Sequence, residues 1–125
     1  MTTLDATMSE FIEHLQEILE PFGPMLARRM FGGYGVYHQG IMFGIVVDDM
    51  LYLKSDEASA GDFIAKGLRQ FEYQKGEKTV KMSFYLAPEE FLEDSDEAAR
   101  WAARAYAAAL RAHAKKSRKT EKIVV

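Results

Sequence analysis

The sequence RRMFGGYGVYHQGIMFGIVV at residues 28–47 decides how the central part of the chain folds. It holds five of the nine glycines, four aromatic rings and a paired arginine. Glycine adopts backbone conformations that cost other residues energy, so Gly32, Gly33 and Gly35 indicate a tight turn or the close approach of another chain. The apolar, β-branched residues that follow favour strands. The stretch therefore predicts a turn that leads into a β-hairpin.

Further patterns extend this hairpin into a sheet. We expect strands at residues 27–31, 35–38, 41–47 and 51–54, with turns at Gln39-Gly40 and Asp48-Asp49. The unbroken apolar run of residues 41–47 indicates a central strand. Two more strands, at residues 71–74 and 80–86, flank a turn at residues 75–78. Such short connections require antiparallel pairing.

Helical periodicity appears before, between and after these strands. Phe11, Leu15, Ile18 and Phe22 form one helical face that ends at Gly23-Pro24. A short helix is expected at residues 57–66, capped by Ser55 or Asp56, and a short helical segment from Pro88 to Leu92. Ser95 or Asp94 caps a long last helix whose apolar stripe is mostly alanine. The members of that stripe are Ala98, Trp101, Ala105, Ala108 and Ala112, with Ala102, Ala109 and Leu110 beside it.

The predicted order α-β-β-β-β-α-β-β-α indicates an α+β fold of two layers, an antiparallel sheet of five to six strands covered on one face by helices. The other face is left to water or to a partner. We divide the chain into a disordered N-terminus (1–6), one domain (7–114) and a basic tail (115–125). At 125 residues one hydrophobic core suffices.

Composition narrows the function classes. The chain has no cysteine, which excludes disulfides, thiol nucleophiles and thiolate metal sites. No apolar run approaches the ~20 residues of a membrane-spanning helix, and the N-terminus lacks the pattern of a secretory signal. We therefore expect a cytoplasmic protein that does not engage a membrane.

The net charge of −3 hides an uneven distribution. Residues 111–122 hold six of the 16 Lys/Arg but only one of the 19 Asp/Glu, so an acidic body carries a basic tail. Two interpretations stay open: the end of a solvated helix, or a weak, salt-sensitive nucleic-acid contact. The candidate nucleic-acid contacts are Arg111, Lys115, Lys116, Arg118 and Lys119.

No pattern for catalysis, a metal or a cofactor is present. The glycines at residues 32–35 lack the spacing of a phosphate-binding loop. His14, His38 and His113 have no metal-ligand spacing, and the acidic pairs Asp48-Asp49 and Glu89-Glu90 fit a turn and a helix start. Arg28 and Arg29 could hold an anion, yet alternation points them to opposite faces of a strand. We predict a non-enzymatic protein without metal or cofactor.

Aromatic and basic residues interleave along the predicted strands. Such residues could stack single-stranded nucleic acid, or they could build the core and cover a sheet face or dimer interface. A small-molecule pocket near Arg28, Arg29 and Tyr34 is a further alternative.

Along the glycine-rich stretch and the predicted strands that follow it, the chain resembles the N-terminal domain of the TfoX/Sxy family, whose members are bacterial regulators of competence genes. The resemblance rests on residues 28–37, 40–43, 51–54 and 80–85 with Pro88, in that order, and covers about residues 11–112. It implies a two-layer α+β fold related to that of secretion chaperones. It also implies regulation of transcription by protein contact, together with a cyclic-AMP receptor-type activator. The full-length regulators carry a second, C-terminal domain, so we expect a stand-alone copy of the first.

The leading hypothesis is a homodimeric interaction module that binds another protein through an exposed sheet face or through the glycine-rich corner at residues 32–37. Its candidate contacts are Arg28, Arg29, Phe31, Gly32, Gly33, Tyr34, Gly35 and Tyr37.

Overall fold

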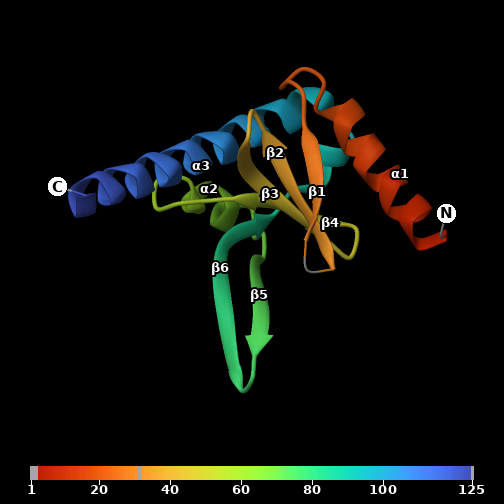
Figure 1. Cartoon of the computed structure of the whole chain (residues 1–125). Coiled ribbons are helices and arrows are strands. Elements are labelled where there is room, and N and C mark those ends of the chain that lie inside the picture. The colour runs from red at the N-terminus through yellow and green to blue at the C-terminus, as the bar shows by residue number, and fades with distance from the viewer. Residues whose placement is uncertain (1–2, 31, 125) are drawn as a thin grey trace.

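The computed structural model describes residues 3–30 and 32–124, and side chains are described for residues 10–30 and 32–117. One six-stranded antiparallel sheet carries a layer of helices on one of its faces (Figure 1). The elements follow in the order α1, β1 to β4, α2, β5, β6, a 3-10 helix and α3. The predicted α+β class, its two layers and its antiparallel pairing are confirmed.

The strands lie in the order β1-β2-β3-β4-β6-β5. The central position predicted for the apolar run is confirmed, since β3 lies third and four of its residues are buried. β1 and β2 both begin earlier than predicted. β5 pairs only with β6, and the hairpin that β5 and β6 form extends beyond the rest of the sheet (Figure 1). The strand bounds are β1 (Leu26–Met30), β2 (Gly33–His38), β3 (Ile41–Val47), β4 (Met50–Lys54), β5 (Gln70–Lys75) and β6 (Lys78–Leu86).

Two-residue turns close three of the hairpins. Gln39 and Gly40 have φ of 48° and 80°, and Asp48 and Asp49 have φ of 53° and 58°. Positive φ at both central residues is typical of type I′ turns, whose twist matches that of the paired strands. In the third turn Gly76 has φ of 66°, between the paired residues of β5 and β6. All three predicted turns are confirmed.

The helices α1 (Thr3–Ile18), α2 (Ala60–Ala65) and α3 (Ser95–Val124) pack on one face of the sheet, together with the 3-10 helix η1 (Glu89–Leu92). Four alanines of α3 are fully buried, as the predicted apolar stripe indicated, and their small side chains let the helix lie close to the strands. They are Ala98, Ala102, Ala105 and Ala108. Leu110 is the exception, because 42% of it is exposed. The largest fully buried side chains are Leu15, Leu19, Val36, Phe43, Val46, Leu53, Phe63 and Phe91.

The first helix differs from its prediction at both ends. It begins at Thr3, within the N-terminal segment that was expected to be disordered, and it ends before Phe22. The backbone N–H groups of Phe22 and Gly23 both donate to the carbonyl of Leu19, which turns the chain after the helix. Phe22 still reaches the core, with its ring 5.3 Å from that of Phe43. The division at residues 1–6, 7–114 and 115–125 stays a prediction.

The second helix is shorter than the predicted 57–66. The N–H of Asp56 donates to Ser59 Oγ at 3.0 Å, and the N–H of Ser59 donates to Asp56 Oδ1 at 3.1 Å. This reciprocal pair holds a turn, so the helix starts only at Ala60. Its six residues bury Phe63, whereas 61% of Ile64 is exposed.

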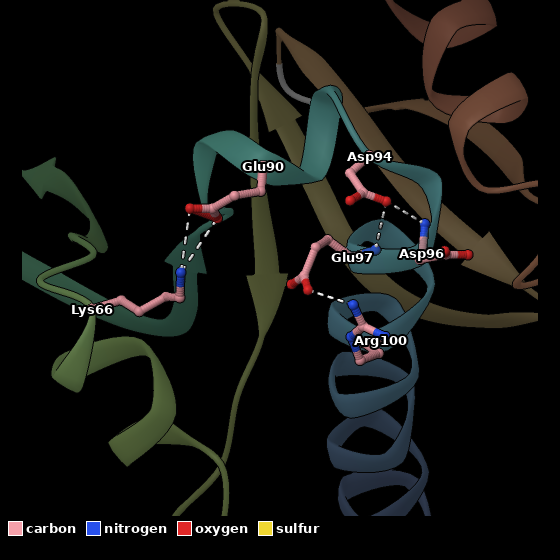
Figure 2. A network of polar contacts seen from close by, with 6 residues as sticks. All are labelled: Lys66, Glu90, Asp94, Asp96, Glu97 and Arg100. Carbon is pink, nitrogen blue, oxygen red and sulfur yellow. Dashed lines mark hydrogen bonds and ion pairs between the residues drawn. The ribbon is translucent and has the colours of Figure 1, made fainter.

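Polar contacts fix the start of α3 and the connection that precedes it (Figure 2). Asp94 Oδ1 accepts from the N–H groups of Asp96 at 2.9 Å and Glu97 at 3.4 Å, so Asp94 is the cap, one of the two predicted candidates. Lys66 Nζ, just after α2, lies 3.3 Å from the carboxylate of Glu90 in η1. The Lys66–Glu90 pair thus joins the end of α2 to η1, and Asp94 fixes the start of α3.

Candidate functional site

The face of the sheet opposite the helices carries side chains from all six strands. Arg28 lies opposite Gly35, Gly35 opposite Ile45, Ile45 opposite Tyr52, and Tyr52 opposite Leu86. Residues opposite one another in antiparallel strands point to the same face. This row therefore crosses five neighbouring strands and begins with a cation at the β1 edge.

A β-bulge in β3 sets which side chains reach this face. Val36 lies opposite Gly44, but the next residue, Tyr37, lies opposite Met42, so Phe43 is the extra residue. The bulge lets Phe43 pack in the core beneath the helices while Met42 joins the opposite face.

A second apolar cluster lies on this face, and all of its residues come from strands. Ile45, Tyr52 and Phe84 are buried, with 7%, 5% and 4% exposed. Phe71 of β5 covers Tyr52, with ring centroids 4.9 Å apart in an edge arrangement. The other residues packed around the cluster are Met42, Val47, Met50 and Leu86.

Beside this cluster lies a groove of about 580 Å³ formed by β1, β2, β3 and the β5–β6 hairpin. The polar side chains among its described lining residues are those of Tyr73, which shares the groove's face, and Tyr34, which packs against the core on the helix side, so these residues bring no converging set of charged or catalytic groups into the groove. Three thioether side chains give it an adaptable wall. The lining residues are Met30, Gly33, Tyr34, Met42, Ile45, Val46, Val47, Phe71, Tyr73, Met82 and Phe84.

Two glycines of β2 leave the sheet recessed on this face, because they carry no side chain there. A Cβ at Gly35 would lie 2.9 Å from Met30 Sδ and 3.0 Å from Met42 Sδ, so it would point at two lining residues. A Cβ at Gly33 would lie 2.2 Å from the carbonyl oxygen of Val46. The glycine-rich corner therefore serves the close approach of strands at the groove, one of the two roles that the sequence indicated.

Cations surround the apolar surface. The guanidinium of Arg28 lies 5.6 Å from the ring centroid of Tyr37, and the ammonium of Lys54 lies 5.1 Å from that of Phe84. Arg69 Nη2 donates to the hydroxyl of Tyr52 at 3.3 Å. Burial lowers the pKa of Lys54, and the charge of Asp56 opposes that shift.

Two further lysines belong to the same face. Lys75 lies opposite Lys78 at the tip of the hairpin, in register with the groove residue Tyr73. None of the described strand residues that alternation places on this face is Asp or Glu. The acidic residues next to these positions along the chain are Asp48, Asp49 and Glu77, which lie in turns, and Glu72, which alternation places on the other face of β5.

The structure places the predicted protein-contact residues in several different parts of the sheet. Gly33 lines the groove, and Arg28, Gly35 and Tyr37 share its face. Tyr34 borders the groove, but its side chain belongs to the helix-covered face and packs against the core there. Arg29 lies opposite Tyr34, on the face away from Arg28, as strand alternation predicted. Gly32 is an exposed turn residue with φ of 79°, and Phe31 lies outside the described residues. Their role in binding stays a prediction.

The predicted nucleic-acid contacts lie on α3, which runs through the basic tail to Val124. Arg111 donates to both carboxylate oxygens of Asp56, at 2.6 and 3.0 Å. Lys115 and Lys116 are exposed, and the side chains of Arg118 and Lys119 lie outside the described ones. Nucleic-acid binding by these residues is untested, although Arg111 already has an acidic partner.

Two of the three histidines make structural contacts. His38 Nδ1 donates to the carbonyl of Pro24 at 2.6 Å, and its ring packs between Phe22 and Tyr106. His14 Nε2 donates to the carbonyl of Leu92 at 3.1 Å. Within the described residues, no three His, Cys, Asp or Glu side chains gather where they could hold a metal ion. Every helix in the described part of the chain is too short or too polar to cross a bilayer.

Sequence reasoning missed the contribution of the β5–β6 hairpin to the site. Phe71, Tyr73 and Met82 line the groove, although they lie far along the chain from the glycine-rich corner. The one available signal was their alternation with polar residues, which predicted strands but not a shared face with β1 to β3.

The fold and this face define a class of domain in which helices cover one face of an antiparallel sheet and the other face is open and apolar. Residues 17–109 match the TfoX N-terminal domain, and the chain belongs to this competence-related family, which is regulatory and not catalytic. The predicted resemblance is thereby confirmed. The chain is also similar to the DNA transformation protein TfoX1 of Aliivibrio fischeri (strain ATCC 700601 / ES114), with 26% identity over 84 residues. That alignment covers 67% of this chain but 40% of the relative, so the chain spans less than half the length of TfoX1.

Proposed function

We propose that this chain is a non-enzymatic, cytoplasmic protein-contact domain that modulates transcription by binding another protein through the helix-free face of its sheet. The candidate partner is a cyclic-AMP receptor-type transcription activator. The observation that carries the proposal is the apolar groove on the open face, in a chain that belongs to a regulatory family.

The chemistry of the groove favours protein contact over the alternatives. A small-molecule or catalytic pocket uses a few convergent polar groups to orient its ligand, whereas the described lining residues include no charged side chain, and Tyr73 is the polar one that shares the groove's face. Apolar surface with methionine and aromatic side chains, bordered by charge, is the composition of a protein interface.

The test combines binding with transcription. The purified chain is passed over an immobilised cyclic-AMP receptor-type activator from the same cell, and transcription is compared between the parent strain and a strain that lacks the chain. We expect binding at micromolar concentration and altered transcription that the wild-type chain restores. Absence of binding together with unchanged transcription contradicts the proposed function.

We also propose that the chain forms a homodimer, which light scattering tests. A mass near that of the 14.2 kDa chain at micromolar concentration contradicts the dimer. The helix-free face does not suit a symmetric dimer, because a two-fold axis there would bring Arg28, Lys54 and the hairpin lysines of two copies together.

A further inference from the structure

Resting on the proposed function, we infer that the helix-free groove binds a peptide segment of another protein that is apolar at its centre and acidic on its flanks. The inference names the chemistry of the partner, which family membership does not supply. It depends on where the cations lie, on how far apart they are and on the shape of the apolar surface.

The charge on this face opposes the charge of the whole chain. The chain has a net charge of −3, yet the charged side chains that reach the open face from the described strands and from Arg69 are all cations. Arg28 and Lys54 each lie over an aromatic ring of that face. Asp56, whose charge acts on Lys54, is engaged with Arg111. An acidic ligand therefore meets attraction at this face, whereas a basic one meets repulsion.

The spread of the cations requires several anionic groups on the ligand. Arg28 belongs to β1 and Lys54 to β4, three strand positions away, which amounts to roughly 14 Å from strand spacing alone. Lys75 and Lys78 lie on a third element, at the tip of the hairpin of β5 and β6. One carboxylate head group, as in a fatty acid, cannot contact both Arg28 and Lys54. A peptide with acidic residues on either side of an apolar centre can.

The apolar surface is recessed, which distinguishes a peptide from a lipid surface. Gly33 and Gly35 lower its floor, while Phe71, Tyr73 and Met82 of the hairpin form its far wall. A bilayer is engaged by apolar side chains that protrude, whereas a hollow accepts protruding side chains of a partner. The groove volume of about 580 Å³ has room for several apolar side chains.

The test selects peptides from a displayed library of random 16-residue sequences on the full chain. Binding of each selected sequence is then compared between the wild-type chain and the Met82→Glu variant, which places a carboxylate in the groove. Met82 is 37% exposed, which makes this substitution compatible with folding. Leu110→Glu is the matched control, because Leu110 is 42% exposed on α3, in the other layer.

We expect the selected peptides to combine an apolar centre with a net negative charge. Arg28→Glu or Lys54→Glu should weaken their binding about tenfold by fluorescence anisotropy, and Met82→Glu at least as much. Lys115→Glu and Leu110→Glu should leave it unchanged. Circular dichroism of each variant confirms that it is folded.

Several results would overturn the inference. They are selection of neutral or basic peptides, failure to select any peptide, and binding that Met82→Glu leaves intact. Tighter binding of hexadecanoate, of vesicles with phosphatidylserine or of single-stranded DNA to the same face would assign the groove to another class of ligand.

The proposed function and this inference can fail separately. If groove peptides bind while deletion of the chain leaves transcription unchanged, the inference stands and the proposed function fails. If the activator binds equally to wild type and to Met82→Glu, while no acidic peptide is selected, protein contact stands and the groove is not its site.

Discussion

Arg111 on α3 holds the carboxylate of Asp56, 55 residues earlier in the chain, through two hydrogen bonds of 2.6 and 3.0 Å. Asp56 also accepts from the N–H of Ser59 in the turn before α2. The pair thus joins the long last helix to the connection between β4 and α2. A residue of the basic segment, which the sequence offered as a nucleic-acid contact, makes an internal contact.

This pair predicts a pH-dependent contribution to stability. The hydrogen bonds from Arg111 are the main cause that lowers the pKa of Asp56 from 3.8 to about 2. A carboxyl whose pKa is lower in the folded state stabilises the fold above its unfolded pKa. The contribution is therefore complete above about pH 4 and is lost as the pH falls through about 2. Arg111→Gln should lower the melting temperature by a few degrees at pH 6, and this difference should shrink toward pH 2.

Lys115→Gln removes one exposed cation from the same helix and is the matched control for general charge effects. Thermal unfolding followed by circular dichroism between pH 6 and pH 2 measures both variants. A difference between wild type and Arg111→Gln that stays constant across this range would mean that the pair does not stabilise the fold.

The packing of the short helix α2 depends on the ring of Phe63. Phe63 is fully buried, stacked 5.2 Å from the ring of Tyr85 and 5.1 Å from that of Trp101. Phe63→Ala should lower the free energy of unfolding by about 3–5 kcal/mol, because it leaves a cavity between the sheet and α3. Ile64→Ala, one residue away but 61% exposed, should change it by less than about 0.5 kcal/mol. Urea unfolding of the two variants checks this contrast, and equal losses would contradict the observed packing.

Two glycines of the same strand should respond differently to alanine. At Gly33 the new Cβ would lie 2.2 Å from the carbonyl oxygen of Val46, an atom of the neighbouring strand that cannot move without disturbing β3. At Gly35 the closest atoms include the sulfurs of Met30 and Met42, which rotate away more easily. We expect Gly33→Ala to cost about 3 kcal/mol or to prevent folding, and Gly35→Ala to cost about 1 kcal/mol. Denaturant titrations that rank the variants in the opposite order would contradict the close approach at Gly33.

Local patterns explain which parts of this molecule were predictable. Alternation along β6, the apolar run of β3 and the paired turn residues each act over a few neighbouring residues, and they predicted the strands and the turns. The groove depends on pairing between strands that are not consecutive, such as Tyr52 with Leu86, and on the bulge at Phe43. No local signal encodes these contacts. The site could therefore be placed near the glycine-rich corner, but its hairpin wall could not be foreseen.

Removal of the basic tail separates the two interaction hypotheses. Among the described side chains of α3, that of Ala109 is the last buried one, and those from His113 to Ser117 are exposed. A chain truncated after Ala112 keeps Arg111 and its pair with Asp56, so its melting temperature should stay within a few degrees of the full chain.

If the tail binds nucleic acid, the full chain should bind a labelled single-stranded DNA with an affinity that falls steeply with salt, and truncation should abolish this binding. Groove-directed peptide binding should be unaffected. DNA binding that survives both truncation and high salt would exclude the tail as its site, and loss of peptide binding on truncation would contradict the placement of the contact site on the opposite layer.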